Sequence, residues 1–367
     1  MAGLNFIQKS NLFSFSATHC LRNDYLYNDC SHCIDICPSN AFHLVRNKLT
    51  LFENECTECA GCIGGCPSEA LTIENFDPNA YIQDFHIRDD EEKIISCKKE
   101  TPCLAVFDSH HLITMALDSN ENITCDIAHC EGCTLNIENK LETRIRDNIT
   151  LTNTFLNEVG LTKIVQTNEA LPQEENNKRA LFRKAFNVAK ESVIVDEEAP
   201  QEVIAPTLQN RLNIATTLPL KVKLLSEALQ RNITNFTTTK FESKHPIFIN
   251  KTISFESCTN CGDCTQFCPT GALFSTDDKL GIIFTSTKCI GCAICDDICK
   301  TDAITTKESY DLVDIAYSRS HELVRYEMVM CHECRCPYPY RGGDPICDRC
   351  HTFKTSMPDM MTLARDM

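Results

Sequence analysis

The chain has 367 residues, 43% of them apolar, and its 51 acidic residues outnumber 35 basic ones to give a formal charge of −16. This charge disfavours nucleic acids and anionic membrane surfaces as partners, and no apolar run approaches the roughly 20 residues that cross a bilayer. The 26 cysteines stand in tight groups separated by long cysteine-free stretches, and the N-terminus shows no export signal. We therefore expect metal ligation in a reducing cytoplasm rather than disulfides.

Residues 1–80 form the first predicted unit, which contains one complete and one incomplete copy of an iron–sulfur signature. The run C-x2-C-x2-C-x3-C-P is complete at 56–67, whereas its first copy has Tyr27 where the first cysteine belongs. Cys20 stands seven residues upstream of that position. A longer loop adds little to the closure entropy, so we predict that Cys20 completes the set and that Tyr27 is a packing residue. The alternative is a three-iron site with Cys20 free.

Residues 81–170 are predicted to be a small α/β domain. Its expected elements are strands at 93–97 and 122–126 and helices at 103–118 and 136–149. Cysteines near the ends of the strands can converge, because sites form at the carboxyl edge of a parallel sheet. These candidates are Cys97, Cys103, Cys125, Cys130 and Cys133. Three interpretations stay open for these cysteines: they bind a metal, they include a redox-active thiol pair, or they are buried as apolar side chains. The layout resembles small iron–sulfur subunits that hand electrons to hydrogenase and heterodisulfide reductase assemblies. His110 and His111 are expected to be surface residues.

Residues 171–245 are predicted to be a helical linker region. Apolar residues recur at helical spacing over 176–195, which predicts a packing helix, and the pattern over 220–232 predicts a second one. Between them, 196–206 is acidic and contains prolines, as linkers do.

Residues 246–307 carry the cysteine run twice without a gap, except that Lys300 replaces the second proline. Residues 37–56 and 268–289 repeat one another, and each is predicted to be a cysteine loop, a short helix, a hairpin and a second cysteine loop. On these motifs, both units resemble the bacterial two-[4Fe–4S] ferredoxins. In that family the cysteine before the proline binds the cluster of the other loop.

The resemblance implies four [4Fe–4S] clusters, each held by four cysteines. In the N-terminal unit, quartet A is Cys20, Cys30, Cys33 and Cys66, and quartet B is Cys37, Cys56, Cys59 and Cys62. In the C-terminal unit, quartet C is Cys258, Cys261, Cys264 and Cys299, and quartet D is Cys268, Cys289, Cys292 and Cys295.

Residues 308–367 hold two further C-x2-C pairs, Cys331 with Cys334 and Cys347 with Cys350. Two such knuckles give the tetrahedral thiolate set of a zinc ribbon, so we predict one structural zinc, although rubredoxin-type iron uses the same geometry. Cys336 is spare and can replace Cys334. The pattern C-x-x-C-H at 347–351 also fits a c-type haem, which the missing export signal and the zinc knuckles disfavour.

These units predict an α+β multidomain fold, in which two ferredoxin-like dicluster units flank a small α/β domain and a zinc-ribbon-like tail follows. Nucleotide and nucleophile–base motifs are missing, so we expect an electron-transfer protein and not an enzyme, with catalysis by the middle-domain cysteines left open. The layout of 20–73 and 258–306 resembles polyferredoxin-like proteins that accompany formate dehydrogenases or hydrogenases. That resemblance implies a larger redox enzyme of this kind as partner, without direct membrane insertion. The alternative is a redox sensor or an assembly factor for a cofactor-containing redox enzyme.

Overall fold

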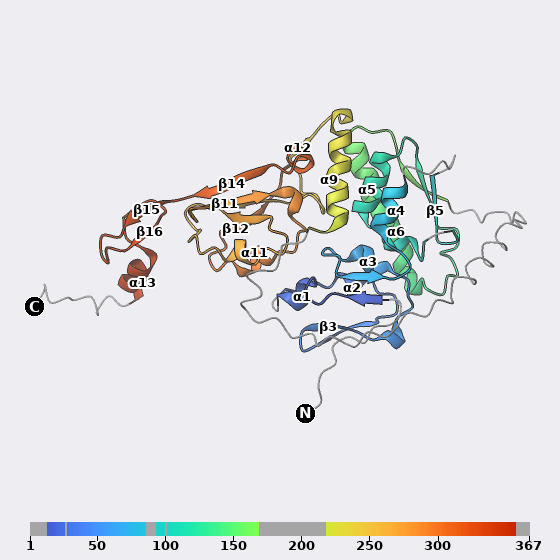
Figure 1. The fold of residues 1–367 in the computed structure, drawn as a ribbon, viewed down its shortest axis with the longest axis horizontal. Coiled ribbons are helices and arrows are strands. Elements are labelled where there is room, and N and C mark those ends of the chain that lie inside the picture. The colour runs from blue at the N-terminus through green and yellow to red at the C-terminus, as the bar shows by residue number, and fades with distance from the viewer. Residues whose placement is uncertain (1–12, 26–27, 86–92, 100, 169–217, 357–367) are drawn as a thin grey trace, which may run out of the picture.

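The computed structural model describes residues 13–25, 28–85, 93–99, 101–168 and 218–356. Tyr27, the helix expected over 176–195 and the acidic linker at 196–206 lie outside these ranges. Figure 1 shows the N-terminal unit beneath the middle-domain helices, the C-terminal ferredoxin unit to one side, and the tail at the far end. Within the described ranges, every helix is too short or too polar to cross a membrane.

The N-terminal unit combines two antiparallel hairpin-like sheets with short helices in its cysteine loops. Its strands are β1 Phe13–Phe15 with β4 Leu71–Ile73, and β2 Phe42–Val45 with β3 Lys48–Leu51. Its helices are α1 Leu21–Asp24, α2 His32–Ile36, η1 Glu53–Glu55 and α3 Gly61–Gly65. The β2–β3 hairpin turns on Arg46 and Asn47, which are both left-handed, as the twist of a two-residue hairpin requires.

The short helices lie before the cysteine–proline pairs, and not after them as the sequence pattern suggested. Cys37 and Cys66 end α2 and α3 in an extended conformation, with ψ of 117° and 115°. The proline ring drives the preceding residue out of the helical region, so Pro38 and Pro67 stop each helix at this point.

The C-terminal unit repeats this plan and enlarges one sheet. Its strands are β9 Asn250–Ile253 with β12 Ile304–Lys307, and β10 Leu273–Ser275 with β11 Gly281–Thr285 and β14 Ser320–Arg325. Its helices are α10 Asp263–Gln266, η5 Ser286–Lys288 and α11 Ile294–Ile298. Strand β14 leads into the tail, which consists of β15 Glu327–Met330, β16 Pro337–Tyr340 and α13 Asp348–Ser356.

The middle domain is a parallel three-stranded sheet with helices in its crossovers. Its strands, in sheet order, are β5 Lys93–Ser96, β6 Ile123–Asp126 and β7 Val165–Asn168. Its helices are α4 Pro78–Phe85, η2 Leu104–Val106, α5 Ser109–Asp118, η3 Ile137–Asn139 and α6 Lys140–Glu158. The first two strands agree with the expected elements. Helix α5 ends where expected but begins later than 103, with η2 in place of the expected first turns. Helix α6 begins and ends later than the expected 136–149, and β7 was not expected.

Helix α9, Leu220–Asn232, joins the middle domain to the C-terminal unit, and its bounds agree with the expected second helix. It packs against α5 on one side and α12, Leu312–Ala316, on the other. Around it lie η4 Ile233–Asn235 and the strand pair β8 Lys240–Phe241 with β13 Tyr310–Asp311.

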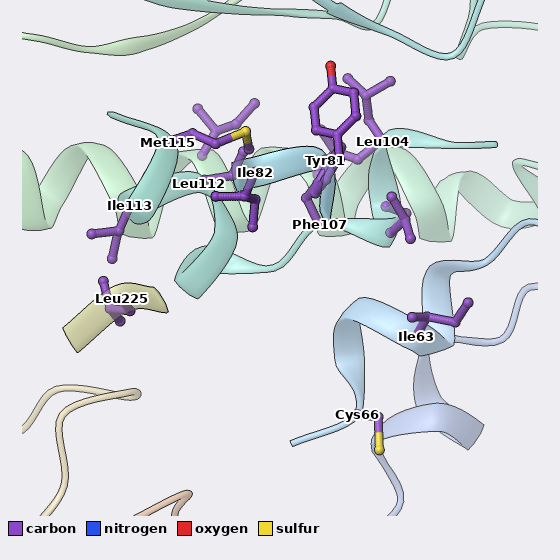
Figure 2. Close-up of a cluster of buried hydrophobic side chains, with 14 of the residues drawn as sticks. Ile63, Cys66, Tyr81, Ile82, Leu104, Phe107, Leu112, Ile113, Met115 and Leu225 are labelled. Carbon is purple, nitrogen blue, oxygen red and sulfur yellow. The ribbon is translucent and has the colours of Figure 1, made fainter. Parts of the chain in front are cut away.

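One hydrophobic core runs from the N-terminal unit through the middle domain to α9, whereas the C-terminal unit has a core of its own. Figure 2 shows members from each part of the shared core, namely Ile63 on α3, Tyr81 on α4, Phe107, Met115 on α5 and Leu225 on α9. The N-terminal unit and the middle domain are therefore packed as one body.

Glycine in α3 allows this close packing. A Cβ on Gly64 would stand 2.2 Å from the carbonyl oxygen of Val106, the last residue of η2, and one on Gly61 would stand 3.1 Å from Cδ2 of Leu141. The backbone of the middle domain thus lies directly on the helix that carries two of the predicted ligands, Cys62 and Cys66.

Candidate iron–sulfur sites

Quartet A comes together around one cavity in the N-terminal unit. Cys20 is the N-cap of α1, Cys33 lies on α2, and Cys66 ends α3. Burial raises the pKa of the Cys33 thiol, and the other three thiols of the quartet raise it further because they lie close by. The displaced Cys20 therefore lies where the run lacks its first cysteine. Its role as a ligand stays a prediction.

The N-terminus of α1 supplies Cys20 with hydrogen-bond donors. Burial raises the pKa of the Cys20 thiol, while the backbone N–H groups of Asn23 and Arg22 lower it. The buried Arg22 also holds α1 on the cysteine loop. Its Nε donates to the Cys30 carbonyl at 2.8 Å, and its Nη1 donates to Asn47 Oδ1 at 2.8 Å.

The regular cysteine loops supply the same donor in another way. The residue two positions after the first cysteine is left-handed in each, and these residues are Glu58, Asn260 and Gly291. This conformation aims its N–H back at the thiol, at 3.5 Å from Glu58 to Cys56 Sγ and at 3.4 Å from Asn260 to Cys258 Sγ. The helix N-terminus at Cys20 thus replaces a strained loop conformation.

The cysteine that closes each run has one backbone arrangement in all four loops. The residue three positions later is left-handed, and these residues are Asn40, Glu69, Gly271 and Asp302. The next turn places a backbone N–H on each thiol, from Ala41 to Cys37, Ala70 to Cys66 and Ala303 to Cys299 at 3.2 Å, and from Leu273 to Cys268 at 3.5 Å. N–H donors favour the thiolate over the thiol, and metal ligands must be deprotonated. Lys300, which replaces a proline, leaves this arrangement intact.

Quartet B lies beside quartet A. Burial raises the pKa of the Cys62 thiol well above its ordinary value, and the quartet's other thiols, together with Cys33 of quartet A, add to the effect. The guanidinium of Arg144 is a neighbour: burial lowers its pKa, and Asp108 and Cys62 counteract that shift.

Quartets C and D line two separate cavities in the C-terminal unit. The cavity of quartet C measures about 280 Å³, and its Cys261 is exposed. Lys251 lines the cavity of quartet D. This buried ammonium donates to Asp296 Oδ2 at 2.5 Å and to Thr306 Oγ1 at 2.9 Å. Burial raises the pKa of the Cys295 thiol, and Lys251 partly offsets that rise.

Asn28 connects the N-terminal and C-terminal units. Its Oδ1 accepts a hydrogen bond from the backbone N–H of Cys30 at 3.0 Å, and its Nδ2 donates to the carbonyl of Cys292 at 2.9 Å. The rings of Tyr25 and Phe267 meet beside it, with centroids 5.8 Å apart. One amide side chain thus links the ligand loops of quartets A and D.

Comparison with known proteins identifies the C-terminal unit. Residues 250–300 match the family model described as a 4Fe-4S dicluster domain. A stretch of 59 residues, 16% of the chain, is 36% identical to a ferredoxin of Methanothermococcus thermolithotrophicus and covers 97% of it. The chain belongs to the 4Fe-4S dicluster ferredoxins. Its dicluster domain at residues 250–300 binds [4Fe–4S] clusters, and an iron–sulfur domain of this kind implies electron transfer.

Two larger relatives are similar to the chain over a short segment. They are the archaeal-type glutamate synthases (NADPH) of Thermotoga maritima and Thermotoga sp. strain RQ2, each 34% identical over 68 residues, or 18% of this chain. The chain spans 13% of the length of these relatives. The likeness therefore concerns a short segment of those proteins.

The tail cysteines differ from the dicluster ferredoxin quartets in spacing. The ligand atoms of Cys331, Cys334, Cys347 and Cys350 all lie within 4.8 Å of one another, and in the described ranges no other group of three or more metal-ligating side chains does so. The Sγ atoms of Cys334 and Cys347 are 3.7 Å apart, close to the edge of about 3.8 Å in a tetrahedron with metal–sulfur bonds of about 2.3 Å. The tail fits a single ion, whereas quartets A to D are spread more widely, as a multi-atom cluster needs.

The tail thiols are also prepared for metal. Desolvation raises the pKa of the Cys331 thiol, but hydrogen bonds from the backbone N–H groups of Cys347, Cys334 and Glu333 outweigh it and lower the pKa to about 6. Cys336 is exposed and lies outside the group of four.

Four of the five middle-domain cysteines lie near one another. Burial raises the pKa of Cys103 to about 12, and thiols Cys59, Cys130 and Cys97 add to the rise. Burial likewise raises the pKa of Cys130 to about 11, with contributions from Glu142, Cys97 and Cys133. Cys125 is different, because it is buried within β6 and burial alone raises its pKa to about 12.

The expectation that His111 lies at the surface is wrong. The residue is 1% exposed, and its side chain forms a capping box at the start of α5 with Asp108. The backbone N–H of Asp108 donates to His111 Nδ1 at 3.1 Å, and Asp108 Oδ1 accepts from the backbone N–H of His111 at 3.2 Å. The spacing D-x-x-H at a helix start was the local signal.

Sequence reasoning missed the residues that hold the loops together, namely Arg22, Asn28, Lys221 and Lys251. Lys221 is buried on α9, and its Nζ donates to the carbonyls of Gly64 and Cys66 and to Asp108. A single lysine inside an apolar pattern, as in IFINKTIS around Lys251, was a usable signal, because lysine is rarely buried without a partner.

Proposed function

We propose that the chain is a cytoplasmic electron-transfer protein that holds four [4Fe–4S] clusters, one in each of quartets A to D, and exchanges electrons with a larger oxidoreductase. The link through Asn28 carries this proposal, because it ties the loop of quartet A to the loop of quartet D. The proposed clusters then form one row in the order B, A, D, C. Bound clusters of this kind supply low-potential one-electron chemistry.

The surroundings of the thiols support this role. All 26 cysteines lie in the described ranges, and none of them forms a disulfide bond. Most of quartets A and B is buried, whereas Cys261 in quartet C is exposed. The chain thus shields the interior of the row from water and leaves quartet C accessible to a partner.

Buried cations set the electrostatic environment along the row. Lys251 lies beside quartet D, and Arg22 and Lys221 bind carbonyls in the loops of quartet A. Positive charge and hydrogen bonding around a cluster raise its reduction potential. The one lysine that lines the cavity of quartet C, Lys300, is exposed and therefore screened by water, and the lining holds no buried lysine or arginine. We therefore expect the lowest potential there.

The formal charge of −16 favours a partner with a basic docking face. A formate dehydrogenase or hydrogenase is the partner class that the polyferredoxin resemblance suggests. For the tail, we propose one structural zinc in the group of Cys331, Cys334, Cys347 and Cys350.

The test is an anaerobic preparation of the full chain with iron, sulfide and zinc quantified, followed by EPR of the reduced protein. We expect at least about sixteen irons and one zinc per chain, and reduction by formate or hydrogen in the presence of the corresponding enzyme. A fully reconstituted protein with eight or fewer irons contradicts the proposal. Clusters that form but exchange no electrons, and that decay in air, favour the redox sensor or assembly factor instead.

Cys20 gives a sharper test of quartet A. In Cys20→Ala, we expect loss of the cubane or its conversion to a three-iron EPR signal. Cys336→Ala is the matched control, because Cys336 belongs to none of the groups of four, and it should leave iron and EPR unchanged. An unchanged spectrum in both variants would remove Cys20 from the ligand set.

A further inference from the structure

The four neighbouring thiols of the middle domain lie at one edge of its sheet. Strands β5 and β6 are parallel, so their carboxyl ends are adjacent, and Ser96 Oγ donates to Asp126 Oδ2 at 2.7 Å across them. Cys97 directly follows β5, and Cys130 and Cys133 lie in the loop that follows β6. This edge is where sites form in parallel α/β sheets.

The loop with Cys130 and Cys133 is fixed by its own hydrogen bonds. The N–H of Cys133 donates to the Cys130 carbonyl at 3.2 Å, and Gly132 between them is left-handed with φ of 75°. Asn136 Nδ2 also donates to the Cys130 carbonyl at 3.2 Å, and its Oδ1 accepts from the N–H of Leu141 at 3.1 Å. The turn is therefore tied to the start of α6.

The geometry points to an iron–sulfur cluster held by Cys97, Cys103, Cys130 and Cys133, a fifth site beyond quartets A to D. The Cys130 thiol has Cys97, Cys103 and Cys133 as neighbours, yet no three of the four thiols fall within the 4.8 Å spread that the tail cysteines show in the described ranges. Like quartets A to D, they are too widely spread for one ion, which suits a multi-atom cluster. Four thiolates serve both [2Fe–2S] and [4Fe–4S] clusters. Cys125 is excluded because it is buried within β6 away from the other thiols.

The position of this site extends the row, and this part of the inference rests on the proposed function. Cys103 is the N-cap of η2, whose backbone lies on α3 at Gly64. Cys59 of quartet B lies close enough to Cys103 to raise the pKa of the Cys103 thiol. The order becomes middle site, B, A, D, C. Cys133 is exposed, as Cys261 is at the other end, so both ends of the row are accessible.

Alkylation of the wild-type holoprotein tests the ligand set without any substitution. Cys133 and Cys336 are both exposed, so a free thiol at either position should react with iodoacetamide under anaerobic conditions. We expect Cys336 to be modified at once and Cys133 to be protected until the iron is removed with a chelator, as read by peptide mass spectrometry. Equal modification of both cysteines in the iron-loaded protein would overturn the proposal.

Iron counts in variants separate this site from the others. Cys97→Ala/Cys130→Ala should lose about two or four irons per chain, for a [2Fe–2S] or a [4Fe–4S] cluster, and keep the EPR signals of quartets A to D. Cys125→Ala is the control and should lose none. A double variant with the wild-type iron count refutes the fifth site and leaves the proposed function standing. If the wild type instead lacks the irons of quartets A to D, the proposed function fails, while protection of Cys133 still reports on the middle site.

Discussion

Substitution of Lys221 tests how α9 holds the cysteine loop of quartets A and B. The Lys221 side chain is 2% exposed, and its Nζ donates to Asp108 Oδ2 at 2.7 Å, to the Cys66 carbonyl at 2.8 Å and to the Gly64 carbonyl at 3.0 Å. Lys221→Met keeps most of the side-chain length and removes the charge and all three hydrogen bonds. It leaves the Asp108 carboxylate buried without its main counter-charge.

The expected cost follows from this geometry. Removing one partner of a buried ion pair destabilises proteins by about 3–5 kcal/mol. We expect the lower part of this range, because α9 stays attached through the backbone N–H groups of Leu220 and Lys221, which donate to Glu69 at 2.6 Å and 3.1 Å. The Asp108 capping interaction with His111 also remains.

The assay is anaerobic urea unfolding followed by circular dichroism, with Lys223→Met as the matched control. Lys223 is on the same helix, its side chain is 63% exposed, and it pairs with Glu227 at 4.0 Å, so its loss should cost less than about 0.5 kcal/mol. The double variant Lys221→Met/Asp108→Asn should recover part of the loss, since it removes the unpaired charge. If Lys221→Met costs no more than Lys223→Met, the buried pair does not stabilise the fold and the reasoning is refuted.

The pH dependence gives a second check on the pair. Burial alone would raise the pKa of Asp108, but Lys221, then His111 and His110, hold it well below its usual range. A carboxyl whose pKa is lower in the folded than in the unfolded state stabilises the fold above the unfolded pKa of about 3.9, and the effect is lost as the pH falls through the folded pKa. The difference between wild type and Lys221→Met should therefore shrink below about pH 4.

Three further substitutions have defined expectations. Gly64→Ala places a Cβ 2.2 Å from a backbone oxygen and should lower the free energy of unfolding by about 1–3 kcal/mol. Gly61→Ala places a Cβ against side-chain carbons, which can move, and should change the free energy of unfolding by less than about 1 kcal/mol. Equal effects of the two substitutions in urea titrations would contradict the packing argument. Burial lowers the pKa of His245 to about 4, so the wild-type fold loses stability as the pH falls below the unfolded-state pKa of about 6.5. In the same titrations, the free energy of unfolding of His245→Phe should rise by about 2 kcal/mol relative to that of the wild type between pH 7 and pH 5. A difference that stays constant with pH would refute the lowered pKa. Cys347→Ser should lose the tail metal in elemental analysis with the iron count unchanged, while Cys336→Ser keeps it; retention of the metal by Cys347→Ser would show that another residue serves.

The sequence was most informative where the relevant residues are close along the chain. The cysteine runs predicted which thiols gather in the C-terminal unit, because a C-x2-C-x2-C loop brings its own members together whatever surrounds it. The apolar pattern over 220–232 predicted α9 for the same reason. Strand β7 was missed because Val165–Asn168 is short and mostly polar, and its place in the sheet depends on pairing with β6.

Long-range partners were beyond local patterns. Asn28 lies 264 positions from Cys292, whose carbonyl it binds, and Lys221 lies 113 positions from Asp108. Neither residue stands in a recognisable motif, since an asparagine in a loop or a lysine in an amphipathic helix is usually solvated. Only packing of the units against one another turns them into connectors.

Exposure along the row constrains where electrons can enter and leave, given the proposed clusters. Quartets A and B sit in the core shared with the middle domain, so most of their cysteines are buried and a partner protein cannot approach them closely. Quartet D is joined to quartet A through Asn28, and within the row the exposed cysteines are Cys261 in quartet C and Cys133 in the middle site. A chain built only to store electrons would have no need to bury the interior quartets and expose the two ends. The distribution of burial therefore argues for passage between two partners, one at each end of the row.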